Sequence, residues 1–306
     1  MQQYILGRLA QGVVTLLVLS LVVFLAVRLS GDPALFLLPE GDTSQEDYEQ
    51  MKKNLGLDKP MYVQYGIFMG NLLRGQFGDS TIDRRPARDA LFERLPATIQ
   101  LAGAGMLLAT VLGIPLGVLS AVKRDSIFDH AAKFFAIIGM ATPQFWIAIM
   151  GILVFGALLK WLPTYGRGGP EHFIMPSVVI AWSIMAGMVR LGRSSMLEIL
   201  DSDYVKFARV KGLKERLILW KHALRNAMIP LLTFSGLSLA GLLNGTIVVE
   251  VVFAWPGIGR LLLEGVVRRD IPVVQATILA SAFFYISLSL VVDILYAYVD
   301  PRIRVN

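Results

Sequence analysis

Six long apolar runs dominate the pattern of hydrophobic and polar positions along this chain. They cover roughly residues 9–29, 97–122, 134–159, 175–189, 228–249 and 273–299, and the fourth is the shortest. A helix needs about 20 apolar residues to cross the hydrocarbon core of a bilayer. The pattern therefore predicts an all-α membrane protein with about six transmembrane helices.

These runs divide the chain into segments. Residues 1–29 are predicted to be an N-terminus with the first span, 30–96 an external segment, 97–300 the core membrane domain, and 301–306 a tail. The composition agrees, since 55% of the residues are hydrophobic, and the absence of cysteine excludes disulfides and thiolate metal sites.

The distribution of basic residues predicts the orientation. The polar stretch 190–228 holds nine Lys and Arg residues, whereas the two short loops 160–175 and 251–272 together hold five. Short cytoplasmic loops carry the excess of Lys and Arg. The N- and C-termini and the loop 190–228 are therefore predicted to be cytoplasmic.

Two pairs of glycines suggest close helix packing. Gly113 with Gly117 and Gly241 with Gly245 have the small-xxx-small spacing that lets helix backbones approach in a membrane. We expect both pairs to lie at helix contacts.

The stretch 201–230 is basic, rich in aromatic residues and placed between two apolar runs. Its spacing predicts two short amphipathic helices with a corner at Gly212, which tolerates positive φ, and Pro230 suits the start of the next membrane helix. Three interpretations compete: a helix pair lying on anionic lipid, a knob that docks into a cytosolic partner, or a DNA-binding helix-turn-helix. Nothing else in the chain favours nucleic-acid binding.

Polar residues also occur in or near the third and fifth runs. They are candidates to line a translocation path, although polar side chains inside bundles also serve as hydrogen bonds between helices. The candidates are Thr142, Gln144, Ser235, Ser238 and Asn244.

The stretch 201–230 resembles the cytoplasmic loop of permease subunits in bacterial ATP-binding cassette (ABC) importers. That loop has an E-A-A-x-x-x-G core, which here reads Lys206, Phe207, Ala208 and, four residues later, Gly212. The missing Glu and first Ala, and the distance to Pro230, are typical of the dipeptide and oligopeptide branch. Other strings resemble the first of the two paired permeases of that branch: GDP at 31–33, LGLDKP at 55–60, GQFGDS at 75–80, RSSMLE at 193–198 and WPGIGR at 255–260.

The resemblance implies a multi-pass protein of the bacterial inner membrane with the ABC importer permease fold. Its partners would be a second, homologous permease subunit forming a heterodimer, two cytosolic ATP-binding subunits, a solute-binding protein and membrane lipid, with no nucleic acid. The chain itself would bind no cofactor or metal, and ATP and Mg would bind the partner ATPase subunits. The residues implied to couple the ATPases to the membrane helices are Asp203, Tyr204, Phe207, Ala208, Arg209, Lys211, Gly212, Leu213, His222, Arg225 and Asn226.

The implied cargo is a small peptide, such as a dipeptide, an oligopeptide or glutathione, with a nickel chelate or an opine as the alternative. A secondary transporter independent of ATP is a further alternative, but no buried carboxylate pair suggests ion coupling. An enzyme is disfavoured, because the chain has no H-E-x-x-H or G-x-S-x-G motif and so no catalytic residues are proposed.

Overall fold

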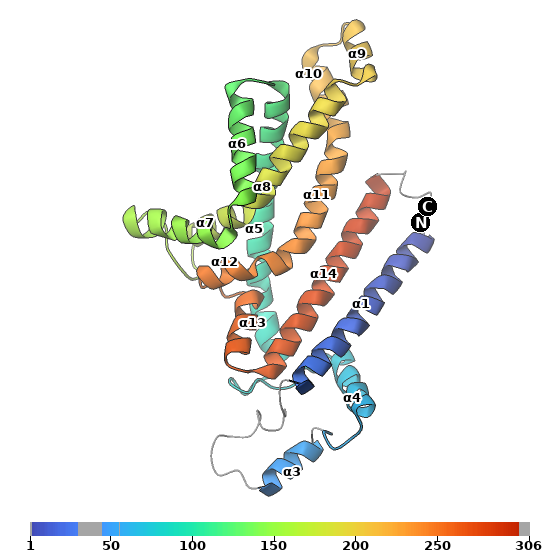
Figure 1. The fold of residues 1–306 in the computed structure, drawn as a ribbon, viewed down its shortest axis with the longest axis vertical. Helices are drawn as coiled ribbons and strands as arrows, with labels where there is room; N and C mark the ends of the chain where they lie inside the picture. Colours follow the sequence, from blue (N-terminus) through green and yellow to red (C-terminus); the bar gives the residue numbers. More distant parts are fainter. Residues whose placement is uncertain (1, 30–44, 55, 300–306) are drawn as a thin grey trace. The chain divides into compact units, whose positions relative to one another are not determined.

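The computed structural model describes residues 2–29, 45–54 and 56–299, and it places this part of the chain mainly in helices (Figure 1). The chain falls into two compact units. Of the described residues, the first unit comprises Ala97–Pro256 with 288–299, and the second comprises 2–29, 45–54 and 56–96 with Gly257–Ser287. The helices α5 (Ala87–Val122) and α14 (Ile271–Val299) contribute residues to both units.

The first unit is a bundle around α8, which packs most extensively against α6 and α11 (Figure 1). Fully buried side chains from several helices fill its core, among them Leu101, Ile180, Met188 and Trp255. The helices of this unit, besides its share of α5 and α14, are α6 (Ile127–Ala141), α7 (Gln144–Gly151), the π-helix η1 (Ile152–Leu158), α8 (Glu171–Leu200), α9 (Asp203–Val210), α10 (Glu215–Leu217), the π-helix η2 (Ile218–Ala223), α11 (Leu224–Gly245) and α12 (Ile247–Val252).

The second unit contains α1 (Gln2–Leu29), α3 (Gln45–Asn54), α4 (Met61–Leu73) and α13 (Ile258–Val267), with its share of α5 and α14. Buried small residues such as Ala87, Ala90 and Ala276 form part of its core. The buried carboxylate of Asp270 accepts a hydrogen bond from the Ser80 hydroxyl. This bond ties the segment before α5 to the start of α14.

Four described helices are long and apolar enough to cross a membrane, and the bent pair α6 and α7–η1 raises this number to five if it counts as one span. The structure therefore confirms a helical membrane protein, with four or five candidate spans where the sequence predicts about six. The helix α11, which covers most of the predicted run 228–249, is not among them.

Two predicted spans have different bounds in the structure. The run 134–159 is not one helix, because α6 ends at Ala141 and α7 begins at Gln144 with a bend of 105° between the two helical parts. Pro143 explains the break, since proline disfavours a helical conformation in the preceding residue, and Thr142 is extended there. The run 175–189 is only part of α8, which continues to Leu200.

The glycine prediction is confirmed for one pair, whereas the other pair makes no helix contact within the described part of the chain. A Cβ added to Gly113 would lie 2.9 Å from the Met188 Cβ, and one added to Gly117 would lie 3.0 Å from the Val189 carbonyl oxygen. These glycines let α5 and α8 approach closely. Beyond the adjacent residues and the backbone of α11 itself, no described atom lies within 4 Å of a Cβ built on Gly241 or Gly245.

Replacing Gly113 with alanine should therefore destabilise the protein, whereas Gly241→Ala should not. The new methyl group at 113 forces α5 and α8 apart, at a cost of about 1–3 kcal/mol for an overpacked contact. Alanine at 241 has room and favours the helix by about 0.5–1 kcal/mol. Thermal unfolding of the two purified variants in one detergent measures the difference, and equal melting temperatures would contradict the packing described for α5.

Candidate functional site

The loop between α8 and α11 contains two short helical elements joined at a sharp corner. The helix α9 follows α8, and α10 leads through η2 into α11 without a break in helical structure. Figure 1 shows α9 and α10 together at one end of α8 and α11. Pro230 lies inside α11 rather than at its start, so the prediction that it begins the membrane helix is wrong.

Gly212 makes the corner. Its φ is +76°, and a Cβ built on it would have no neighbour within 4 Å. The Gly212 N–H donates to the Arg209 carbonyl at 2.9 Å, and the Leu213 N–H donates to the Ala208 carbonyl at 3.2 Å. This pair of bonds is the Schellman ending of a helix, which requires a left-handed residue at the glycine position. The conformation predicted for Gly212 is therefore confirmed.

The inner side of α9 is packed against the rest of the loop. Val205 and Ala208 are buried in a cluster with Ile218, and Ile199 and Leu200 at the end of α8 pack against it. Ala208 was a predicted partner contact, but its side chain is only 9% exposed. It contributes to the attachment of α9 and presents little surface to another molecule.

The outer side of α9 is an exposed apolar stripe. Tyr204 is 44% exposed, Phe207 67% and Val210 84%, and their spacing of three residues places them along one side of the helix. We call these three residues the α9 stripe. Val210 was not among the predicted coupling residues, although the i, i+3 spacing that relates Phe207 to Tyr204 also relates Val210 to Phe207.

Two polar interactions brace the loop. Arg209 donates to the Glu215 carboxylate across the corner, with its Nη2 at 2.8 Å from Oε1 and its Nε at 3.2 Å from Oε2. The Asn226 amide on α11 donates to the Tyr204 hydroxyl at 2.9 Å. The hydrogen bonds from Arg209 hold the pKa of Glu215 below its usual value. Arg209 and Asn226, which were predicted to contact a partner, thus make contacts within the loop.

The remaining predicted coupling residues lie on the outside of the loop or along its edges. Asp203 forms an ion pair with Lys206 at 3.2 Å, and the His222 carbonyl accepts a hydrogen bond from Asn226. Lys211, Leu213 and Arg225 are exposed. These placements leave charged groups beside the α9 stripe.

A buried ionic cluster that was not predicted from the sequence lies in the same unit. The Asp129 carboxylate on α6 is fully buried and accepts hydrogen bonds from Arg193 Nε at 2.6 Å and Nη2 at 2.9 Å. Lys133 Nζ lies 3.0 Å away, and Ser120 on α5 donates at 2.6 Å. The cluster thus joins α5, α6 and α8. The only sequence signal was the i, i+4 pair of Asp129 and Lys133 behind a Ser126 N-cap.

An apolar cluster connects this region to the loop. Ala121 at the end of α5, Met196 on α8, Ala223 in η2 and Ala227 on α11 are all buried together. The helix η2 is therefore packed directly against the ends of α5 and α8 and the start of α11.

The predicted path residues are spread over two regions. Thr142 and Gln144 flank the break between α6 and α7, and the Thr142 hydroxyl donates to the Ile138 carbonyl. Ser235 and Ser238 lie on α11, where the Ser235 hydroxyl donates to the Leu231 carbonyl. The side chain of Asn244 lies outside the described residues. Their role in a path stays a prediction.

Two family models match the chain. The model described as "Binding-protein-dependent transport system inner membrane component" matches residues 113–305, and its N-terminal companion, "Binding-prot-dependent transport system membrane comp, N-term", matches residues 1–102.

The chain is also similar to curated proteins over nearly its whole length. It is 41% identical over 306 residues to the glutathione transport system permease protein GsiC of Escherichia coli (strain K12), with 99% of each chain covered. It is 38% identical over 313 residues to a putative peptide transport system permease protein of Brucella abortus (strain 2308), again with 99% of each chain covered.

A chain in an inward-facing structure of the MetNI methionine ABC transporter has a similar fold. The TM-score is 0.57 at 16% sequence identity, and the match covers 69% of this chain and 96% of that chain. This similarity supports the arrangement of helices and nothing finer.

Asp129→Asn should destabilise the protein strongly. Asparagine cannot neutralise Arg193 and Lys133, and removing one partner of a buried ion pair costs about 3–5 kcal/mol. The matched control is Asp125→Asn, because the Asp125 side chain pairs with Arg124 at the surface. Its bond to Asp129 comes from the backbone N–H, which asparagine keeps, and a surface substitution changes stability by at most about 0.5 kcal/mol. Thermal unfolding of both variants tests this difference, and equal stabilities would contradict the role assigned to Asp129.

Proposed function

We propose that this chain, which belongs to the family of inner-membrane components of binding-protein-dependent transport systems, carries small peptides inward as one permease subunit of an ATP-driven importer. Family membership follows from the two matched models, which together cover most of the chain, and from 41% identity over its length to a transport permease. The chain is accordingly a multi-pass protein of the bacterial inner membrane.

The observation that supports ATP-driven coupling most directly is the loop at Gly212. A helix that is anchored on its inner side and apolar on its exposed outer side is suited to docking into a groove of a partner. The α9 stripe is the exposed side, and Val205 with Ala208 is the anchor. The lipid-surface interpretation accounts for the stripe less well, because it does not require the Arg209–Glu215 brace that fixes the corner.

The energy source is proposed to lie in other chains. The sequence has no G-x-x-x-x-G-K-[ST] loop, which is the usual cradle for the phosphates of ATP. We therefore assign ATP and Mg to two cytosolic ATP-binding subunits, and the full assembly would also contain a second permease subunit and a solute-binding protein. The loop 190–228 and both termini would face the cytosol, as the basic residues predict.

In this scheme, closure of the ATP-binding subunits displaces α9, and the displacement passes to the membrane helices through rigid contacts. The ion pair of Arg209 and Glu215 holds α9 and α10 at a fixed angle across the corner. The buried cluster of Ala121, Met196, Ala223 and Ala227 then transmits the movement to α5, α8 and α11.

The proposed substrate class rests on the names of the relatives. One is named for glutathione transport and another for peptide transport. Glutathione is a tripeptide, so both names fit a path for small peptides. A nickel chelate or an opine remains the alternative. The three substrate classes are distinguished by adding an unlabelled dipeptide, nickel chelate or opine and measuring which one reduces the uptake of labelled glutathione.

Phe207→Asp should uncouple transport without unfolding the protein. A charge in the centre of the α9 stripe opposes docking in an apolar groove, and loss of one anchor of this kind weakens binding by about tenfold or more. The side chain is 67% exposed, so the melting temperature should not change. The measurements are the ATPase subunits that co-purify from mild detergent and the uptake of labelled glutathione driven by ATP.

The matched control is Tyr62→Asp on α4, where the side chain is 77% exposed. It lies in the segment predicted to be external, so the co-purified ATPase subunits should stay at the wild-type amount. Retention of full coupling by Phe207→Asp would refute the docking role of α9. Transport of glutathione without any ATPase subunit would favour a secondary transporter.

A further inference from the structure

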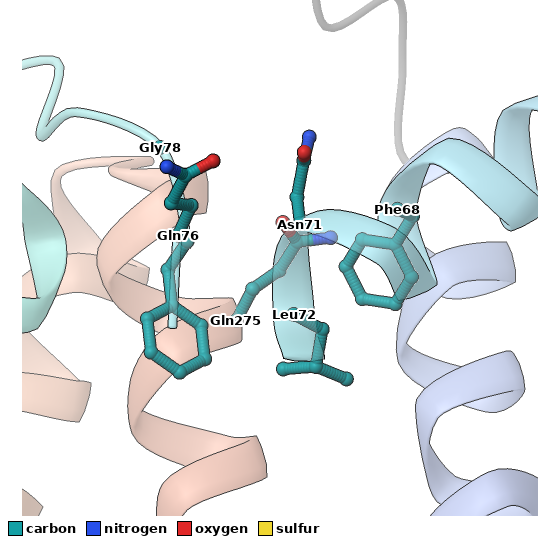
Figure 2. Close-up of a pocket in the computed structure, with 7 residues that line it drawn as sticks. Phe68, Asn71, Leu72, Gln76, Gly78 and Gln275 are labelled. Carbon is teal, nitrogen blue, oxygen red and sulfur yellow. The ribbon is translucent and has the colours of Figure 1, made fainter. Parts of the chain in front are cut away.

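Two adjoining cavities in the second unit have opposite chemical character. The smaller one has a volume of about 140 Å³ and is bordered by three side-chain amides, those of Asn71, Gln76 and Gln275, and by Gly78. Figure 2 shows these residues around the pocket, on the end of α4, the segment that follows it, and α14. Side-chain amides both donate and accept hydrogen bonds, so this pocket suits a polar group.

The larger cavity has a volume of about 480 Å³ and an almost entirely apolar wall. The hydroxyl of Ser20 in this wall is already satisfied, since it donates to the Leu17 carbonyl and bonds to the Tyr65 hydroxyl at 2.9 Å. The two cavities share Leu72 and Phe77 in their linings, so they lie side by side. The residues of the larger wall come from α1, α4, α5 and α14 and the segment after α4: Val13, Leu16, Leu17, Ser20, Met69, Leu72, Leu73, Phe77, Leu91, Phe92, Leu279, Ala280, Phe283 and Phe284.

The larger cavity opens outward rather than into a closed core. Of its lining residues, Val13 is 55% exposed, Leu73 82% and Phe92 57%. Val13 and Phe92 belong to candidate membrane spans. An apolar space offers water no hydrogen-bond partners, so beside membrane spans it is suited to an apolar group.

A basic residue that lies close in sequence to both linings indicates what this group is attached to. Arg74 is exposed, makes no ion pair within the described part of the chain, and lies in sequence between Leu73 of the larger wall and Gln76 of the smaller one. No acidic residue lines either cavity. Guanidinium and amide groups both donate hydrogen bonds, and both are suited to hold a phosphate.

We propose that the two cavities form one site for a membrane phospholipid, with an acyl chain in the larger cavity and the phosphate and polar head at the amides and Arg74. The volumes agree with this assignment. An apolar protein cavity of about 150 Å³ holds a benzene molecule, so the larger cavity has room for about eighteen carbon atoms and the smaller for about six heavy atoms. These sizes match one long acyl chain and a small phosphate-bearing head. The bound lipid would fill the space between α1 and the helices α5 and α14 of the same unit.

The test measures lipid retained by the assembled transporter. The complex, co-expressed with its partner subunits and purified in mild detergent, is examined by native mass spectrometry, then stripped of lipid and titrated with phosphatidylglycerol. Val13→Trp fills the larger cavity, and Val111→Trp is the matched control, since Val111 is 57% exposed on α5 and lines neither cavity. Arg74→Glu and Gln76→Leu alter the polar end at exposed positions and carry little risk of misfolding.

Wild type and Val111→Trp should retain one phospholipid, and Val13→Trp, Arg74→Glu and Gln76→Leu should each lower the affinity for phosphatidylglycerol about tenfold. Equal lipid retention by Val13→Trp and Val111→Trp would overturn the proposal. A second combination of results would also overturn the proposal: no lipid bound to wild type, and loss of the second permease subunit from the Val13→Trp complex. Those results would mean that the cavity holds a helix of that subunit.

Discussion

The carboxylate of Asp129 is the contact on which the arrangement of the first unit depends. It is fully buried, and it is paired with Arg193 by two hydrogen bonds, with Lys133, and with the hydroxyl of Ser120. A buried charge is costly unless it is paired and hydrogen-bonded, so these groups must stay together whenever the bundle is folded. The result is a fixed junction of α5, α6 and α8, from which α8 leads directly to the loop at Gly212.

The loop at Gly212 has a fixed conformation and an exposed apolar surface. Its inner residues, the Schellman ending at Gly212 and the Arg209–Glu215 pair fix the angle between α9 and α10, while Phe207 and Val210 remain exposed. A rigid element that presents apolar surface can transmit a displacement from a partner, which a flexible loop cannot do. The two sides of α9 therefore have different roles. Val205 and Ala208 on one side hold the loop together, and Phe207 and Val210 on the other side are exposed for binding.

The sequence predicts those features that depend on local pattern and misses those that depend on tertiary pairing. The runs 9–29, 97–122 and 273–299 lie within α1, α5 and α14 because each is continuously apolar, and the corner at Gly212 follows from its backbone freedom. The predicted run 175–189 stops before Arg190 and Arg193 because both side chains are charged. The helix α8 nevertheless continues to Leu200, and Arg193 is paired with Asp129 inside the fold. Tertiary packing also decides which side of α9 is buried. Ala208 is buried because Ile218 packs on it, whereas Phe207 stays exposed, and the local sequence pattern does not distinguish the two residues.

The most direct test of the account is chemical crosslinking from a single cysteine on the α9 stripe. The chain contains no cysteine, so Val210→Cys, at the most exposed position of the stripe, and Tyr62→Cys each carry a unique thiol. A thiol-to-amine crosslinker is applied to the assembled transporter in membranes, with and without ATP. Val210→Cys should be crosslinked to an ATP-binding subunit, and Tyr62→Cys should not. Failure of Val210→Cys to reach any ATP-binding subunit, in a complex that still hydrolyses ATP and imports peptide, would contradict the docking role of α9.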